Sequence, residues 1–153
     1  MIGSPKGEPE TGAGNSIMRL GDMAWTALRW IYALFFFGTG VAILLYVLFG
    51  IGGPPVPPTA ADAAFQGALH QSGFIDPLLA ASYLVGGGAL ALRRTTPLGL
   101  ILLAPAVVII ACDDILLANA APVGIAVAGI WGLLALRSLP DFRGLWSAGV
   151  AQP

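Results

Sequence analysis

Charged side chains are scarce in this chain: Asp, Glu, Lys and Arg make up 10% of its 153 residues, whereas 57% of the residues are hydrophobic. Soluble domains carry about 25% charged residues. The excess apolar surface must therefore face something other than water, and a lipid bilayer is the simplest such environment. The formal net charge of −1 leaves no basic face that would attract nucleic acid.

Residue types that build catalytic and metal centres are also rare. There is one cysteine, Cys112, and one histidine, His70. A single cysteine excludes an internal disulfide and a cysteine-rich metal site, and the chain has no CxxC, no phosphate-binding glycine loop and no pair of haem-ligand histidines. We therefore expect no metal site and interpret Cys112 as a small buried hydrophobic residue. As a standalone enzyme the chain is poorly equipped, because it has no recognisable nucleophile with its base.

Long apolar runs dominate what is present. They predict four transmembrane helices, over residues 25–50, 74–92, 97–118 and 121–139. The expected fold is thus all-α: an integral membrane four-helix bundle over residues 24–139, with a flexible cytoplasmic tail at 1–23 and a second cytoplasmic tail at 140–153. Trp146 is expected to anchor the second tail at the membrane interface.

The connections between these runs are also readable. Residues 59–73 predict a short helix on the outer membrane surface, with Thr59 as N-cap, Asp62 at the fourth position of a capping box, and Phe65 and Leu69 on one face. The turn between the last two spans is expected at residues 119–122, and Pro105 is expected to kink the third span.

The cations indicate the orientation of the helices. Every Lys and Arg lies in the N-terminal region, between the second and third spans, or in the C-terminal region: Lys6, Arg19, Arg29, Arg93, Arg94, Arg137 and Arg143. With four spans these three regions share one side, which the positive-inside rule makes cytoplasmic. We expect a multi-pass protein of the cell inner (plasma) membrane with both termini in the cytoplasm.

Small residues offer surfaces for close helix packing. They recur at Gly124, Ala128 and Gly132 in the fourth span, and as three consecutive glycines at 86–88 in the second. These positions either pack inside the monomer, which we favour, or contact a protein partner or a second copy of the chain.

Acidic groups at the outer half are the candidates for chemistry, because ionisable residues within a bilayer are costly. They are Asp62, Asp76, Asp113 and Asp114, with His70 beside them and no cation nearby. Neighbouring positions on a helix differ by about 100°, so at most one of Asp113 and Asp114 faces the bundle interior. A carboxyl group there suits proton exchange with a quinone headgroup or a translocated ion. Alternatively the third span ends near Cys112, and both aspartates lie in water.

Asp76 and His70 have simpler interpretations. Asp76 opens the second span, followed by Pro77, as expected of ordinary helix N-terminal stabilisation. His70 is either a ligand, a proton shuttle or a solvated interfacial residue, and the last is favoured because one histidine with scattered acids makes a poor metal site.

The order of these features resembles the DoxX-like family of small four-helix membrane proteins. The resemblance covers residues 28–137 and rests on Phe65-x3-Leu69-x2-Ser72-Gly73-Phe74-x2-Pro77, on the run from Gly86 to Arg93, and on the run from Pro97 to Pro105. Two departures from the family pattern stand out. Many members have a Lys after the glycine motif of the first span, which here reads Gly38 to Ala42, and many have a His late in the third span, where this chain has Asp113.

The resemblance implies a small membrane subunit associated with a quinone-linked redox complex, because some members of the family form the membrane part of thiosulfate:quinone oxidoreductase. No cofactor is certain from the sequence, and quinone is the one that the resemblance suggests. A protein partner or a homo-oligomer is the assembly that it suggests. A non-catalytic membrane scaffold or assembly factor is the alternative. A small transporter is least favoured, because one four-helix unit has no internal repeat.

Overall fold

The computed structural model describes residues 12–53 and 56–140, with side chains from Gly21 onward, and Trp146 lies outside these ranges. The described residues form five helices and no strand, which confirms the all-α prediction. The helices are α1 (Gly12–Phe49), α2 (Ala60–Gln71), α3 (Ile75–Ala91), α4 (Thr96–Leu116) and α5 (Ala121–Arg137).

Helix α1 begins earlier than expected. It starts at Gly12 rather than near Trp25, so it continues into the stretch expected to be a flexible tail. No proline occurs between Gly12 and Gly53, so nothing in this stretch removes a helical hydrogen bond. The helix ends at Phe49, where Gly50 adopts a positive φ of 65°, a conformation that glycine adopts without strain.

The predicted short helix is present as α2, and Thr59 is its N-cap. The Thr59 hydroxyl accepts a hydrogen bond from the backbone N–H of Asp62 (3.1 Å) and donates one to the carbonyl of Leu117 at the end of α4 (2.6 Å). The Asp62 side chain is 1% exposed and accepts a hydrogen bond from Gln66 (2.7 Å). One side of α2 therefore turns inward, toward the other helices.

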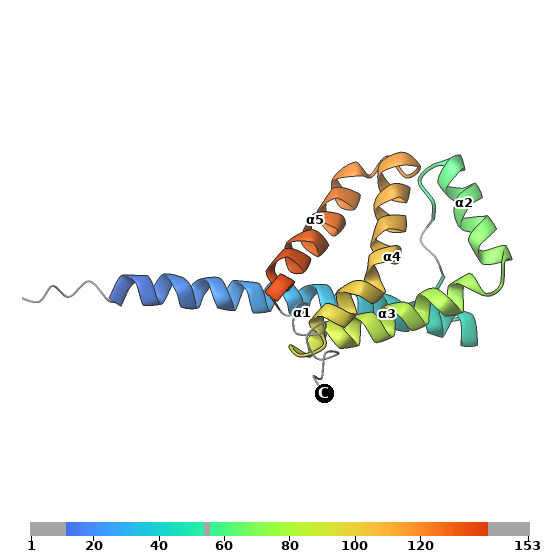
Figure 1. Ribbon diagram of the computed structural model, residues 1–153. Coiled ribbons are helices and arrows are strands. Elements are labelled where there is room, and N and C mark those ends of the chain that lie inside the picture. Colours follow the sequence, from blue (N-terminus) through green and yellow to red (C-terminus); the bar gives the residue numbers. More distant parts are fainter. Residues whose placement is uncertain (1–11, 54–55, 141–153) are drawn as a thin grey trace, which may run out of the picture.

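The last two predicted spans correspond to α4 and α5, and their turn lies where expected. Asn119 has a positive φ of 55°, and Pro122 lies in the first turn of α5. Pro105 is inside α4, and Figure 1 shows α4 leaving the neighbourhood of α3 as it continues toward the turn.

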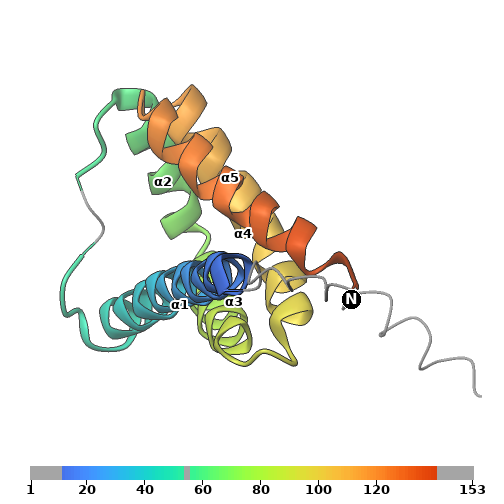
Figure 2. The same ribbon diagram turned by 90° about the vertical axis from the view of Figure 1, so that its left-hand side faces the viewer.

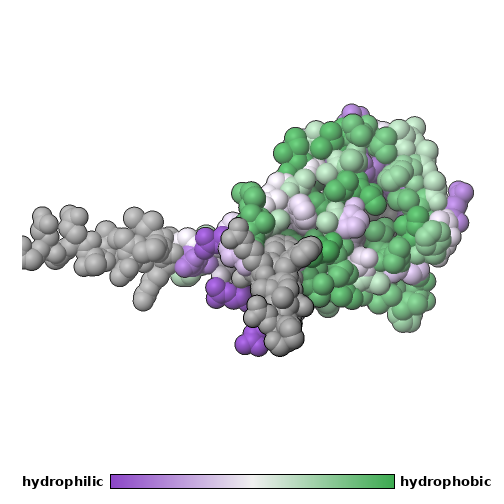
Figure 3. Space-filling view, in the orientation of Figure 1, coloured by the Kyte–Doolittle hydropathy of each residue, from purple (hydrophilic) through white to green (hydrophobic). Residues whose placement is uncertain are grey.

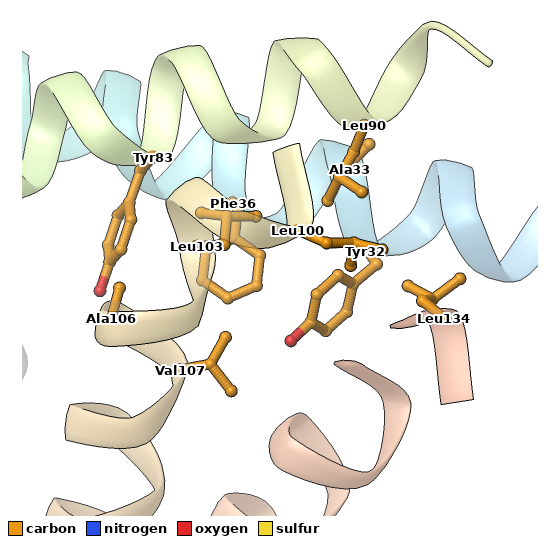
Figure 4. Close-up of a cluster of buried hydrophobic side chains, with 10 residues drawn as sticks. All are labelled: Tyr32, Ala33, Phe36, Tyr83, Leu90, Leu100, Leu103, Ala106, Val107 and Leu134. Carbon is orange, nitrogen blue, oxygen red and sulfur yellow. The ribbon is translucent and has the colours of Figure 1, made fainter. Parts of the chain in front are cut away.

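Helices α1 and α3 run side by side in Figures 1 and 2, and α3 packs on α4, which packs on α5. In Figure 1, α5 and the second part of α4 rise steeply from the α1–α3 pair. A core joins these four helices (Figure 4); it consists of Tyr32, Ala33, Phe36, Tyr83, Leu90, Leu100, Leu103, Ala106, Val107 and Leu134.

Glycine allows the closest approach between α1 and α3. A Cβ on Gly87 would lie 2.7 Å from the backbone nitrogen of Phe37, and one on Gly86 would lie 2.7 Å from Leu103. Two of the three consecutive glycines thus pack inside the monomer. Gly88 and Gly132, by contrast, have no neighbouring atom within 4 Å of an added Cβ.

The outside of the molecule is strongly apolar. Figure 3 shows hydrophobic residues over most of the helical body, and exposed side chains include Leu34, Val85 and Ile125. Among the described residues, two helical segments, Gly21–Phe49 and Thr96–Leu116, are long and apolar enough to cross a membrane. Helices α2 and α3 meet at a bend of 92°, and if they count as one broken span, the number of candidate membrane spans becomes three.

Candidate functional site

A cavity of about 590 Å³ lies between α1, the loop after it, α2, α3 and α4. Its walls are mainly apolar, with Ile43, Leu79 and Ile110 among the lining residues. Polar groups line it as well: Thr39, Tyr46, Gln66, His70, Asp76, Tyr83 and Asp113. A mostly apolar cavity of this size with a few convergent polar groups is typical of a small-molecule binding site.

His70 and Asp76 form a pair at one side of the cavity. The Nδ1 atom of His70 lies 2.5 Å from Oδ2 of Asp76, and the two side chains are 37% and 17% exposed. The pair joins the last turn of α2 to the first turn of α3, and Gly73, with a φ of 72°, makes the bend between them possible. In the tautomer that carries a proton on Nδ1, His70 donates a hydrogen bond to the Asp76 carboxylate, which orients the ring and leaves Nε2 available to a ligand.

The pairing of His70 with Asp76 adds a contact to the interpretations of these two residues made from the sequence. Asp76 does lie in the first turn of α3, as expected for N-terminal stabilisation. The His70 side chain is 37% exposed, is paired with Asp76, and lies 6.4 Å, centroid to centroid, from the ring of Tyr46. The sequence could not show the pairing, because it depends on the bend between the two helices.

Asp113 and Asp114 face different surroundings, as the step of about 100° between neighbouring helical positions requires. Asp113 lines the cavity, and its Oδ1 atom is buried without a hydrogen-bond partner among the described residues. Asp114 packs toward α5, because a Cβ added to Gly124 would lie 2.9 Å from the Cβ of Asp114. Helix α4 continues to Leu116, so it does not end near Cys112.

Cys112 is exposed at the surface of the chain, which corrects the expectation of a buried hydrophobic residue. It precedes Asp113 on α4, and the same step of about 100° turns it away from the cavity. In an apolar surface of this kind a small thiol can face lipid instead of protein.

Tyr83 is a cavity residue that the sequence did not single out. On α3, Leu79 and Tyr83 follow Asp76 by three and seven residues. At this spacing the three side chains share one helical face. That spacing is the signal that could have drawn attention to it, once Asp76 was a candidate. Thr39, Tyr46 and Gln66 had no comparable signal.

The described arginines lie away from the cavity, and the one on α1, Arg29, is near the middle of that helix. Arg29 donates to the hydroxyl of Thr96 (3.2 Å), and Arg137 binds Asp22 (3.0 Å) and lies over the ring of Trp25. Seventeen residues separate Arg29 from Tyr46 on the same helix, which is about 26 Å along its axis. The cavity and these arginines are therefore well separated along α1.

No group of three His, Cys, Asp or Glu side chains in the described part of the chain is arranged to hold a metal ion. The polar groups of the cavity are instead hydrogen-bond donors and acceptors spaced around an apolar space. Such an arrangement suits a mainly apolar organic ligand with a few polar atoms.

Fold and site together define the class of this protein: over the residues that the structure describes, it is all-helical, with two or three helices that could cross a membrane and a ligand-sized cavity. No family model, no curated protein and no solved structure matches the chain.

Proposed function

We propose that this chain is a small integral membrane subunit of the DoxX-like type, whose cavity binds a quinone headgroup in association with a redox complex. The observation that carries the proposal is the cavity of about 590 Å³, which brings His70, Asp76 and Asp113 together from three helices. In this proposal α1, α3, α4 and α5 cross the inner membrane as a four-helix unit, with both termini in the cytoplasm.

The lengths of the shorter helices are compatible with four crossings. Helices α3 and α5 have 17 residues each, which is about 26 Å at 1.5 Å per residue. That length is at the lower end of the range for transmembrane helices, and a bilayer can thin slightly to accommodate it. Helix α2 would then lie at the outer surface, and the arginines at the cytoplasmic end.

The chemistry of the cavity supports a quinone. Its apolar walls favour a hydrophobic ring that partitions from lipid, and the polar groups can hydrogen-bond the ring oxygens. The Nε2 atom of His70 accepts a hydrogen bond from a hydroquinone hydroxyl when the ring is neutral, and donates one to a quinone carbonyl when it is protonated. Asp113 offers a second group that exchanges a proton, and no redox group of the chain itself is required, because the quinone carries the electrons.

Binding of a short-tailed quinone to the purified protein in lipid nanodiscs, measured by calorimetry, tests the proposal. We expect saturable binding that His70→Gln and Asp113→Asn each weaken by about tenfold, since a hydrogen bond to a charged group contributes about 1.5 kcal/mol or more. Asp114→Asn is the matched control, because Asp114 does not line the cavity, and it should bind as the wild type does.

Association with a redox complex needs a separate test. Purification from the native membrane in mild detergent, followed by mass spectrometry, should recover an oxidoreductase subunit together with the chain. A wild-type protein that binds no quinone but keeps a stable partner would contradict the quinone site and favour a non-catalytic scaffold.

A further inference from the structure

Tyr83 is held rigidly between α1 and α4. The residue is 5% exposed, and its ring meets the ring of Phe36 edge to face with centroids 5.3 Å apart. Gly40 brings α1 close beside it, because a Cβ at Gly40 would lie 3.0 Å from the Cβ of Tyr83. Figure 4 shows the ring extending from α3 toward α4. The direction of the hydroxyl is therefore fixed before any ligand arrives.

Tyr83 lines the cavity, and its hydroxyl is not among the buried polar atoms that lack a partner in the described residues, so this oxygen is open to the cavity. The other buried tyrosine of the core, Tyr32, donates its hydroxyl proton to the carbonyl of Val127 (3.0 Å). A hydroxyl group that faces a cavity bonds to whatever occupies that cavity, water or a ligand. The cavity is therefore the route by which a partner reaches Tyr83.

We infer that Tyr83 is a ligand-binding residue, whose hydroxyl donates a hydrogen bond to a carbonyl oxygen of the quinone headgroup. The identity of the ligand rests on the function proposed above, whereas the role of Tyr83 rests on its own geometry. Seven residues separate Asp76 from Tyr83, or about 10 Å along one face of α3. Because Tyr83 is almost fully buried and His70 is 37% exposed, Tyr83 marks the deep end of the site and the His70–Asp76 pair its outer end.

Tyr83→Phe tests this inference with little change in packing, since it removes only the hydroxyl. We expect the affinity for a short-tailed benzoquinone in nanodiscs to fall about fivefold, the equivalent of one hydrogen bond of about 1 kcal/mol. The carbonyl stretching band of the bound quinone should move to higher frequency in the infrared spectrum, because one carbonyl loses its donor. Tyr32→Phe is the matched control, and it should change neither the affinity nor the band.

An alkylbenzene with the same tail and no carbonyl groups separates binding from structure. It should bind the wild type and Tyr83→Phe equally well. Equal quinone affinity and an unchanged carbonyl band in Tyr83→Phe would overturn the role of Tyr83 alone, and so would an equal loss for both ligands. A wild-type protein that binds no quinone would overturn this inference together with the proposed function.

Discussion

The hydroxyl groups of Tyr32 and Tyr83 lie in the same core and differ in their partners. Tyr32 connects α1 to α5 through its hydrogen bond to Val127, whereas Tyr83 lines the cavity. Hydrogen bonds between helices in membranes are worth about 0.6 kcal/mol on average. In the absence of ligand, Tyr32→Phe should therefore lower the stability by about this amount.

Tyr83→Phe should not lower the stability under the same conditions, in contrast to Tyr32→Phe. It removes a hydroxyl that is open to the cavity, so the thermal unfolding midpoint should stay level or rise. Thermal unfolding of both variants in one detergent, followed by circular dichroism, measures the difference. A fall in the midpoint for Tyr83→Phe equal to that for Tyr32→Phe would show that Tyr83 has a partner within the protein.

Gly87 and Gly88 are neighbours in sequence with different surroundings. An added Cβ at Gly87 would meet the backbone of α1 at Phe37 and Ala33, which cannot move aside cheaply, whereas Gly88 faces open space. Gly87→Ala should destabilise the protein by about 1–3 kcal/mol by forcing α1 and α3 apart. Gly88→Ala should be neutral or slightly stabilising, because alanine favours the helix.

Reversible unfolding of the two alanine variants in mixed micelles compares them directly. Gly88→Ala serves as the control for the cost of any substitution in this stretch. Similar destabilisation by both would mean that the approach of α1 to α3 does not depend on Gly87.

At the scale of the helices, periodicity and turn residues predicted much of what the structure contains. The bounds of α3, α4 and α5 lie within about two residues of the expected spans, and α2 was recognised from Thr59 and from the shared face of Phe65 and Leu69. The early start of α1 was missed because a polar, glycine-containing segment does not reveal that it continues a helix.

The candidate site was only partly predictable, because it depends on how helices meet. His70, Asp76 and Asp113 are candidates from the sequence because ionisable side chains are rare in so apolar a chain. The bend of 92° that pairs His70 with Asp76, and the packing that buries Tyr83, are tertiary features. Neither follows from the periodicity of a single helix, so the cavity itself could not be read from the sequence.

The N-cap of α2 gives a prediction for a whole element. Thr59 connects the start of α2 to Leu117 and also accepts from Asp62. Thr59→Val removes both hydrogen bonds and should cost about 1 kcal/mol, as the loss of an N-cap usually does. Amide hydrogen exchange should accelerate in residues 60–71, while exchange in the core of α3 should stay slow.

Thr26→Val is the appropriate control, because the Thr26 hydroxyl bonds only to the carbonyl of Asp22 in its own helix. It should leave exchange in α2 unchanged. If Thr59→Val also leaves it unchanged, then α2 is held by its apolar contacts alone.

At the scale of the whole molecule, the described arginines and the acids of the cavity are separated. Arg29 lies near the middle of α1, Arg137 contacts Asp22, and Arg93 and Arg94 are exposed in the loop between α3 and α4, whereas the cavity lies beside the C-terminal part of α1. In a membrane such a division fixes orientation, because cations are retained on the cytoplasmic side. Four crossings predict that Gln71 and Ala120 face outward and Arg94 faces the cytoplasm.

Cysteine labelling in intact cells tests this topology. Cys112 is replaced by alanine, and single cysteines are placed at Gln71, Ala120 or Arg94 by the substitutions Gln71→Cys, Ala120→Cys and Arg94→Cys. We expect a membrane-impermeant maleimide to label the first two in intact cells and the third only after permeabilisation. The variant without cysteine controls for background labelling.

The pattern of labelling also distinguishes the alternatives to four crossings. If α3 is only half of a broken span, its two ends lie on the same side or one lies inside the bilayer, so Gln71 and Arg94 would not show opposite accessibility. If α5, with its 17 residues, fails to cross, Ala120 and the end of α5 at Arg137 would share a side, which a fourth variant, Arg137→Cys, detects. Four crossings require that the two ends of α3 are labelled from opposite sides, and likewise the two ends of α5. Only then do the cavity and the arginines face different sides of the membrane.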